Sequence, residues 1–233
     1  MNALEIVQEV CRRIGFPVSN TATNSTDPQI TQILSLLNEE GREQSARTDW
    51  TNLQTELTFT SVATESQGAM STIAPGFRYI INETIWNRSE QRTAPGPVTP
   101  RQYQQLKSGL ASLVDPVWRI RGGNLVLQPA PAAGRSYAFE YVDKRWVVGA
   151  DATRKEQFAI DTDTHLLDDD ALLYGTLWRW RQAKGLEYAE DFVKYERKIE
   201  ELIGRDGGRP DLYLHSGNHD FPDPTVPDGN WQV

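Results

Sequence analysis

The chain has 233 residues, a length that can bury a sizeable core in one large domain or in two small lobes, and we expect one domain with an insertion. Its formal net charge of −8 argues against a protein that grips nucleic-acid phosphates through a cationic face. The single cysteine, Cys11, excludes a disulfide within one chain. No stretch approaches the roughly 20 apolar residues that span a membrane, so we expect a soluble protein made in the cytoplasm, with no membrane partner.

The first part of the chain is predicted to form two amphipathic helices. Apolar residues recur at three- and four-residue steps from Leu4 to Ile14, and this pattern ends at Gly15. The polar stretch 19–27 has too little apolar surface to fold by itself, so we expect a mobile loop there. Pro28 then occupies the first position of a second helix, which we expect to be capped by the aspartate before it and to end near residue 46.

The middle of the chain is predicted to be β-rich. Leu57 and Phe59 alternate with threonines, which is typical of a half-buried strand, and a further strand is expected at 84–87. The hairpin over 118–127 is the firmest local prediction, because its two consecutive glycines supply the positive φ that a tight turn needs. A capping box at 99–102 predicts a short helix between these strands.

Another strand with an aromatic face is predicted over 137–142. Its aromatic residues, which alternate with smaller or polar ones, are Tyr137, Phe139 and Tyr141. We expect Trp146 and Val148 to continue the same sheet.

Two helices and a tail complete the chain. Three consecutive aspartates from Asp168 complement the positive end of a helix that is expected to end at Lys184 and Gly185. The final helix carries its apolar residues on one side, with Gly204 as the expected C-cap. The rest of the chain is rich in proline, glycine and aspartate and cannot build a core of its own, so its isolated apolar residues are expected to order against a partner surface. These residues are Leu212, Tyr213, Leu214, Phe221 and Trp231.

The predicted fold class is therefore α+β. Residues 1–48 and 161–204 supply the helices of an antiparallel bundle, and residues 49–160 form an inserted β-rich region, hairpin- or sandwich-like, with one short helix. Residues 205–233 form an extended C-terminal arm, which we interpret as an inter-subunit arm.

A metal site is considered first among the possible reaction centres. The aspartates that supply oxygen ligands suited to calcium or magnesium are Asp161, Asp163, Asp168, Asp169 and Asp170. Their spacing lacks both the glycine and the final glutamate of a calcium loop, so we favour helix capping and surface solvation over a bound cation. His215 and His219 have the four-residue step of zinc helices, but the residues between them are poor helix formers, and we favour two exposed histidines.

Other catalytic patterns are missing from the sequence. It contains neither the Gly-x-Ser-x-Gly nucleophile motif nor a phosphate-binding glycine loop before Lys-Ser or Lys-Thr. We therefore expect no catalytic, cofactor-binding or metal-binding residues, and no enzyme.

The segment Trp178-Arg179-Trp180-Arg181 has the composition of a nucleic-acid patch, in which aromatic rings alternate with cations. Neighbouring residues on a helix point about 100° apart, so the four side chains cannot form one platform. We favour core or interface tryptophans with flanking surface arginines over base stacking. Trp86 and Arg88 are interpreted with the same caution, and the interface candidates in the folded part are Trp86, Arg88, Trp178 and Trp180.

Several segments together resemble phage head–tail adaptor proteins, related in style to the tail tubular A proteins of short-tailed phages. The resemblance runs from the first predicted helix to about residue 204. The segments that carry it are Trp50 with Leu53, Glu56, Leu57, Phe59 and Thr60, then 85–88, 120–123, 139–141, and 178–180 through 185–186.

This resemblance implies a non-enzymatic virion protein at the head–tail junction, assembled as a ring of 12 subunits between the portal protein and the distal tail or nozzle protein. Genomic DNA would pass through the bore without specific binding, and acidic residues that line the bore would repel its phosphates. Two other classes stay open. One is a virion carbohydrate-binding or baseplate-type module, with Tyr137, Phe139 and Tyr141 as an exposed platform, and the other is a metal-assisted hydrolase built on Asp161 to Asp170.

Overall fold

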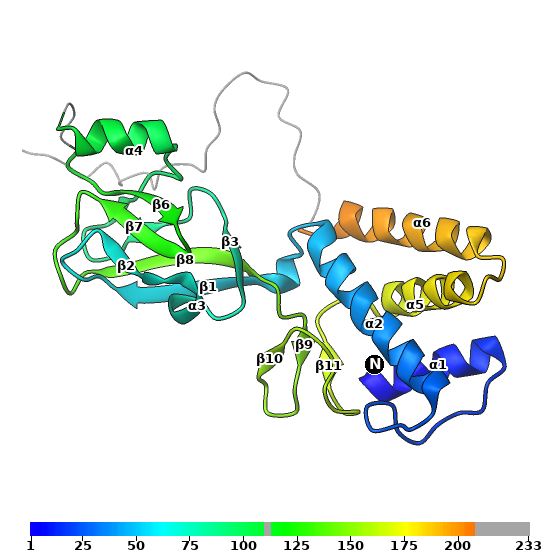
Figure 1. Ribbon diagram of the computed structural model, residues 1–233. Helices are drawn as coiled ribbons and strands as arrows, with labels where there is room; N and C mark the ends of the chain where they lie inside the picture. The colour runs from blue at the N-terminus through cyan, green and yellow to red at the C-terminus, as the bar shows by residue number, and fades with distance from the viewer. Residues whose placement is uncertain (110–112, 208–233) are drawn as a thin grey trace, which may run out of the picture.

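A computed structural model describes residues 1–109 and 113–207, and within these ranges the chain is α+β, as the sequence predicts. Figure 1 shows a helical lobe, which contains both the first and the last helices, and a β lobe formed by the middle of the chain. The two lobes are joined where α2 leads into β1 and where β8 leads back toward the helices.

Four helices form the helical lobe: α1 (Ala3–Ile14), α2 (Pro28–Arg47), α5 (Asp169–Ala183) and α6 (Ala189–Arg205). Their ends confirm most of the predicted caps. Asp27 accepts a hydrogen bond from the backbone of α2, Asp168 caps α5, and Gly15 ends α1 in the left-handed region at φ 77°. Helix α5 packs against α1, α2 and α6, which places it at the centre of the lobe.

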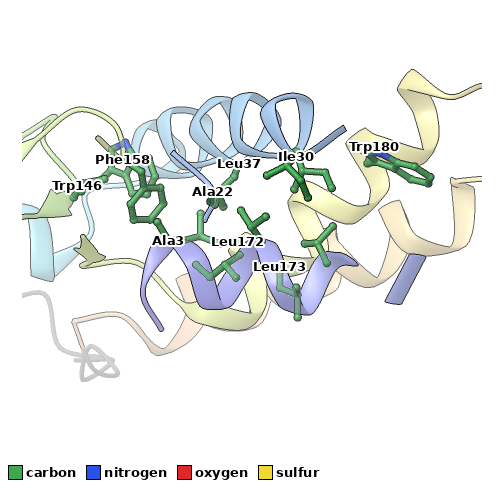
Figure 2. Close-up of a cluster of buried hydrophobic side chains, with 14 of the residues drawn as sticks. Ala3, Ala22, Ile30, Leu37, Trp146, Phe158, Leu172, Leu173 and Trp180 are labelled. Atoms are coloured by element: carbon green, nitrogen blue, oxygen red, sulfur yellow. The ribbon is translucent and has the colours of Figure 1, made fainter. Parts of the chain in front are cut away.

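The core of the helical lobe also contains side chains from the segment that returns from the β lobe. Figure 2 shows Trp146 and Phe158 at one end of a cluster that also contains Leu37 of α2 and Leu172 of α5. The Trp146 ring lies against Gly41 of α2, where an added Cβ would come within 2.1 Å of it. The indole of Trp146 fits here only because residue 41 is a glycine without a side chain. The ring is fully buried.

Two sheets form the β lobe. The larger has the order β1-β8-β4-β5, with β3 also paired to β8; its strands are β1 (Gln54–Thr60), β3 (Phe77–Ile80), β4 (Trp86–Asn87), β5 (Arg92–Thr93) and β8 (Ser136–Asp143). The smaller has the order β2-β7-β6; its strands are β2 (Ser66–Ala69), β6 (Val117–Arg121) and β7 (Asn124–Gln128). Both sheets contribute to one apolar core.

The predicted hairpin and short helix are confirmed in the β lobe. Strands β6 and β7 pair around Gly122 and Gly123, whose φ values are 56° and 76°. Helix α4 (Pro100–Lys107) begins at a capping box of Thr99 and Gln102. The chain also forms a short helix, α3 (Met70–Ile73), and a three-residue 3-10 turn, η1 (Thr51–Leu53), that the sequence did not predict.

Three other predictions need correction. Residues 146–148 do not extend the sheet of β8, because β9 (Val147–Val148) pairs with β10 (Arg154–Lys155) and β11 (Thr164–His165) in a separate small sheet. The strand expected at 84–87 is reduced to β4. Gly204 does not cap α6, since the helix continues to Arg205 and its C-cap is Asp206.

Candidate assembly surfaces

The acidic segment before α5 stabilises the helical lobe. Asp161 accepts hydrogen bonds from the backbones of Ala22 and Thr23 and from the hydroxyls of Thr21 and Thr23, at 2.7 to 3.0 Å. Burial alone would raise the pKa of Asp161, but these hydrogen bonds outweigh it and lower the pKa. The loop between α1 and α2, which we expected to be mobile, is therefore anchored, and Ala22 is buried.

The other aspartates of this segment also have protein partners. Asp163 is fully buried and pairs with Lys155 at 2.8 Å, Asp168 caps α5, and Asp169 accepts from the N-terminal ammonium group at 2.7 Å. Lys198 lies 3.6 Å from Asp168 and from Asp170. Capping by Asp168 agrees with the prediction, whereas Asp163 is buried in an ion pair and is not solvated at the surface as we expected.

The Trp178 to Arg181 segment differs from its predicted arrangement in one residue. Trp178 and Trp180 are 8% and 6% exposed, so contacts within the chain already bury most of the surface of these two interface candidates. Arg179 was expected to be a surface arginine, but it is only 8% exposed. Arg181 is partly exposed and pairs with Asp191 of α6.

Arg179 is the centre of a buried polar cluster between α2 and α5. Its guanidinium donates to Glu40 at 2.8 Å and to Glu39 at 2.9 Å, and it also pairs with Glu43. Burial raises the pKa of Glu40, although Tyr195 and Arg179 favour its charged form. Gly175 lies against the Glu40 side chain, and an added Cβ would come within 2.2 Å of it.

The aromatic face of β8 lies inside the β lobe. Tyr137, Phe139 and Tyr141 are 1 to 2% exposed and belong to the core that the two sheets share. Phe59 of β1 lies near this row of rings, with centroids 5.6 Å from Tyr137 and 6.0 Å from Phe139. The prediction that these residues form an exposed carbohydrate-binding platform is therefore wrong.

Trp86 and Arg88 lie on the outer face of the larger sheet. Trp86 is 46% exposed and pairs across the strands with Ala138, whose small side chain leaves room beside the indole. A surface hollow of about 690 Å³ lies here, and Arg88 on its rim pairs with Glu56 of β1. An exposed tryptophan beside a hollow is a typical anchor point for a protein partner.

A second apolar patch, which the sequence analysis did not single out, lies at the turn between α5 and α6. It consists of Leu186, Tyr188, Phe192 and Val193, which are 36 to 54% exposed. Phe192 packs edge-to-face on the buried Trp178 ring at 5.1 Å, so the patch continues outward from the core. Leu186 and Tyr188 precede α6, and apolar residues in a connection between two helices have no helix of their own to cover them, so the sequence offered a signal for this part of the patch.

The remaining interface candidates, Leu212, Tyr213, Leu214, Phe221 and Trp231, lie outside the described residues, as do His215 and His219. The third histidine, His165, lies in the folded part, and burial lowers its pKa. In the part of the chain that the structure covers, no helix is both long and apolar enough to cross a membrane.

Residues 1–214 match the model of the SU10 adaptor protein family. The chain belongs to this family. A comparison with the curated proteins finds no match. The match includes both lobes and ends at Leu214, within the predicted arm.

Membership identifies the adaptor as a structural phage protein that assembles with other components of the virion. This confirms the coarser part of the resemblance, whereas the narrower likeness to tail tubular A proteins stays a prediction. Among the described residues, the Trp86 hollow on the β lobe and the apolar patch on the helical lobe both expose large apolar side chains, as contact sites between molecules do.

Proposed function

We propose that this adaptor forms a ring of 12 subunits that joins the portal protein to the distal tail or nozzle protein and leaves a central channel for DNA. The single observation that carries the proposal is the family match over residues 1–214. The ring, the portal as partner and the passage of DNA during ejection are inferences from that membership.

The distribution of exposed apolar residues supports a ring. The Trp86 hollow and the Leu186 to Val193 patch lie on different lobes, so one subunit offers two distinct surfaces. A contact between two different patches is heterologous and repeats from copy to copy until the rotation closes. The distal arm, with Phe221 and Trp231, supplies further contacts to a neighbouring subunit or to the portal.

The negative net charge of the chain supports a channel through which DNA passes without binding to the wall. The net charge of −8 repels a polyanion, and neighbouring copies in a ring would add their charges around the same axis. A bore lined mainly by carboxylates would keep the duplex away from the wall, whereas lysines and arginines would retain it. An image of the ring with a predominantly basic lumen would contradict this part of the proposal.

The test is assembly of the purified chain with the portal protein of the same phage. Mass measurement and electron microscopy of the mixture are expected to show 12 copies stacked on the portal, even if the free chain is monomeric. Trp86→Asp is expected to weaken assembly at least tenfold, because an interface anchor often contributes more than about 1.4 kcal/mol. Val62→Asp is the matched control, since Val62 is also 46% exposed but lies in the loop after β1. If the chain does not bind to the portal protein in this mixture, the proposed function is refuted.

A further inference from the structure

Strand β1 is an open edge of the larger sheet. On one side it pairs with β8 over its whole length, from Gln54 opposite Val142 to Thr60 opposite Ser136. Among the described residues no strand pairs with its other side. Alternate backbone groups on that side therefore have no ladder partner, which makes β1 a template for one more strand.

The side chains of β1 leave the same edge open. Leu57 and Phe59 face the shared core of the β lobe but are only partly buried. Natural proteins usually protect an exposed edge with lysine, proline or a very short strand. β1 has seven residues, contains neither lysine nor proline, and has Glu56 as its single charge. An edge of this kind is usually covered in the functional protein.

The chain leaves the helical lobe beside the start of β1. The carboxylate of Asp206, just after α6, accepts from the backbone and the hydroxyl of Thr51 at 2.9 and 2.8 Å. Gly207 also lies near Thr51, because a Cβ built on it would be 3.6 Å from the Thr51 methyl group. In Figure 1 the end of α6 lies at the segment that joins α2 to β1. The residues after Gly207 therefore leave the folded part beside Thr51, three residues before β1 begins at Gln54.

The sequence just beyond this point has the pattern of a short strand. Leu212 and Leu214 are two residues apart, as are Leu57 and Phe59, and Tyr213 between them also favours strands. Arg209 precedes Pro210, which restricts it to extended conformations. The family match ends at Leu214, so the matched region includes this segment and excludes the rest of the arm.

The lengths agree. From Thr51 to Leu57 the chain crosses three residues of 3-10 turn and three of strand, roughly 16 Å in all. From Gly207 to Leu212 five extended residues reach roughly 17 Å. A segment that runs parallel to β1 therefore brings Leu212 level with Leu57 and Leu214 level with Phe59.

We propose that residues 211–215 add to β1 of the same chain as a parallel edge strand, with Leu212 and Leu214 covering the open flank of the β-lobe core. Tyr213 then faces the opposite side, next to Thr58. This docking fixes the root of the arm, so that only the residues beyond it reach out to a neighbour. The proposal concerns the free subunit and does not depend on ring formation.

Hydrogen exchange of the full-length free chain tests the pairing. Leu212→Asp with Leu214→Asp is expected to speed exchange of the outward-pointing β1 amides roughly tenfold, as loss of a hydrogen bond of about 1.4 kcal/mol would do. Phe221→Asp with Trp231→Asp is the matched control, because it places the same two charges farther along the arm, and it is expected to leave β1 unchanged. Equal exchange in the two variants would refute the pairing.

A disulfide tests the register and the identity of the chain. Thr58→Cys with Tyr213→Cys brings two thiols to adjacent strands, within the Cα separation of roughly 4.4 to 6.8 Å that a disulfide needs. The native Cys11 is buried and does not compete. Oxidation is expected to link the two cysteines within one chain, at unchanged mass by non-reducing electrophoresis. A covalent dimer would show that the segment docks on another copy, and the absence of a link would show that it does not dock in this register; either result overturns the proposal.

Discussion

Replacing Arg179 with methionine probes the polar cluster that joins α2 to α5. Glu40 is fully buried and would lose its cation, while Glu39 and Glu43 are 53% and 45% exposed and would be hydrated instead. Breaking one buried ion pair costs about 3–5 kcal/mol, whereas each exposed pair contributes about 1 kcal/mol or less. For a chain of this size we expect the midpoint of thermal unfolding to fall by roughly 6 to 20 °C.

Urea unfolding followed by tryptophan fluorescence measures the loss directly. Arg205→Met is the matched control in the same lobe, because Arg205 and its partner Glu201 are 73% and 46% exposed, and it should cost about 1 kcal/mol or less. Adding Glu40→Gln to Arg179→Met should recover part of the stability, since no buried charge is then left unpaired. If Arg179→Met costs no more than the control, the cluster does not stabilise the lobe in the way described.

The pH dependence gives an independent check of the same reasoning. Burial raises the pKa of Glu40, so the folded state binds a proton to Glu40 more readily than the unfolded state does. Without Arg179 this preference increases, and protonation then relieves the unpaired charge. The stability difference between the wild type and Arg179→Met should therefore shrink as the pH falls from 7 toward the ordinary glutamate value of 4.5. A difference that stays constant over this range would contradict the account.

Three further outcomes follow from the packing of the helical lobe. Gly41→Ala should destabilise the chain by about 1–3 kcal/mol in urea, because its Cβ would overlap the Trp146 ring, whereas Gly204→Ala has open space and should not. Asp161→Asn should speed amide exchange in the α1–α2 loop. Because the pKa of Asp161 is lowered in the folded state, the wild type loses stability as the pH falls below 3.8, and this loss should be smaller in Asp161→Asn. The pKa of His165 is lowered by burial, so the wild type should lose stability as the pH falls below 6.5, and His165→Gln should remove this loss in urea titrations across that range.

The helices could be predicted because their signals are local. Asp27 and Asp168 lie directly before the helices they cap, and the capping box at Thr99 needs only four residues. The turn at Gly122 and Gly123 is local in the same sense. Each of these features depends on neighbours in sequence, which a single chain displays.

The short strands could not be predicted from such signals. β4, β5, β9, β10 and β11 have two residues each, too few to show a period of two. Their existence depends on partners elsewhere in the chain, such as His165 opposite Val147. The same limit explains why Trp146 and Val148 were assigned to the wrong sheet.

The surfaces were predicted in part. Exposure of Trp86 agrees with its choice as a contact residue, but the contact itself stays a prediction. Arg179 was misjudged because a charged residue usually faces solvent, and its buried partner Glu40 lies 139 residues away. The apolar patch at Leu186 was missed because the exposure of a side chain depends on which distant elements cover it, and the sequence does not display these.

The wide separation of Glu40 and Arg179 also affects how the protein is made. Translation proceeds at roughly 5–20 residues per second, so Arg179 is synthesised roughly 7 to 28 s after Glu40. During that time the β lobe can pair its own strands, while the apolar faces of α1 and α2 stay uncovered. Because α1 and α2 both pack on α5, the core of the helical lobe cannot be completed until α5 has been synthesised.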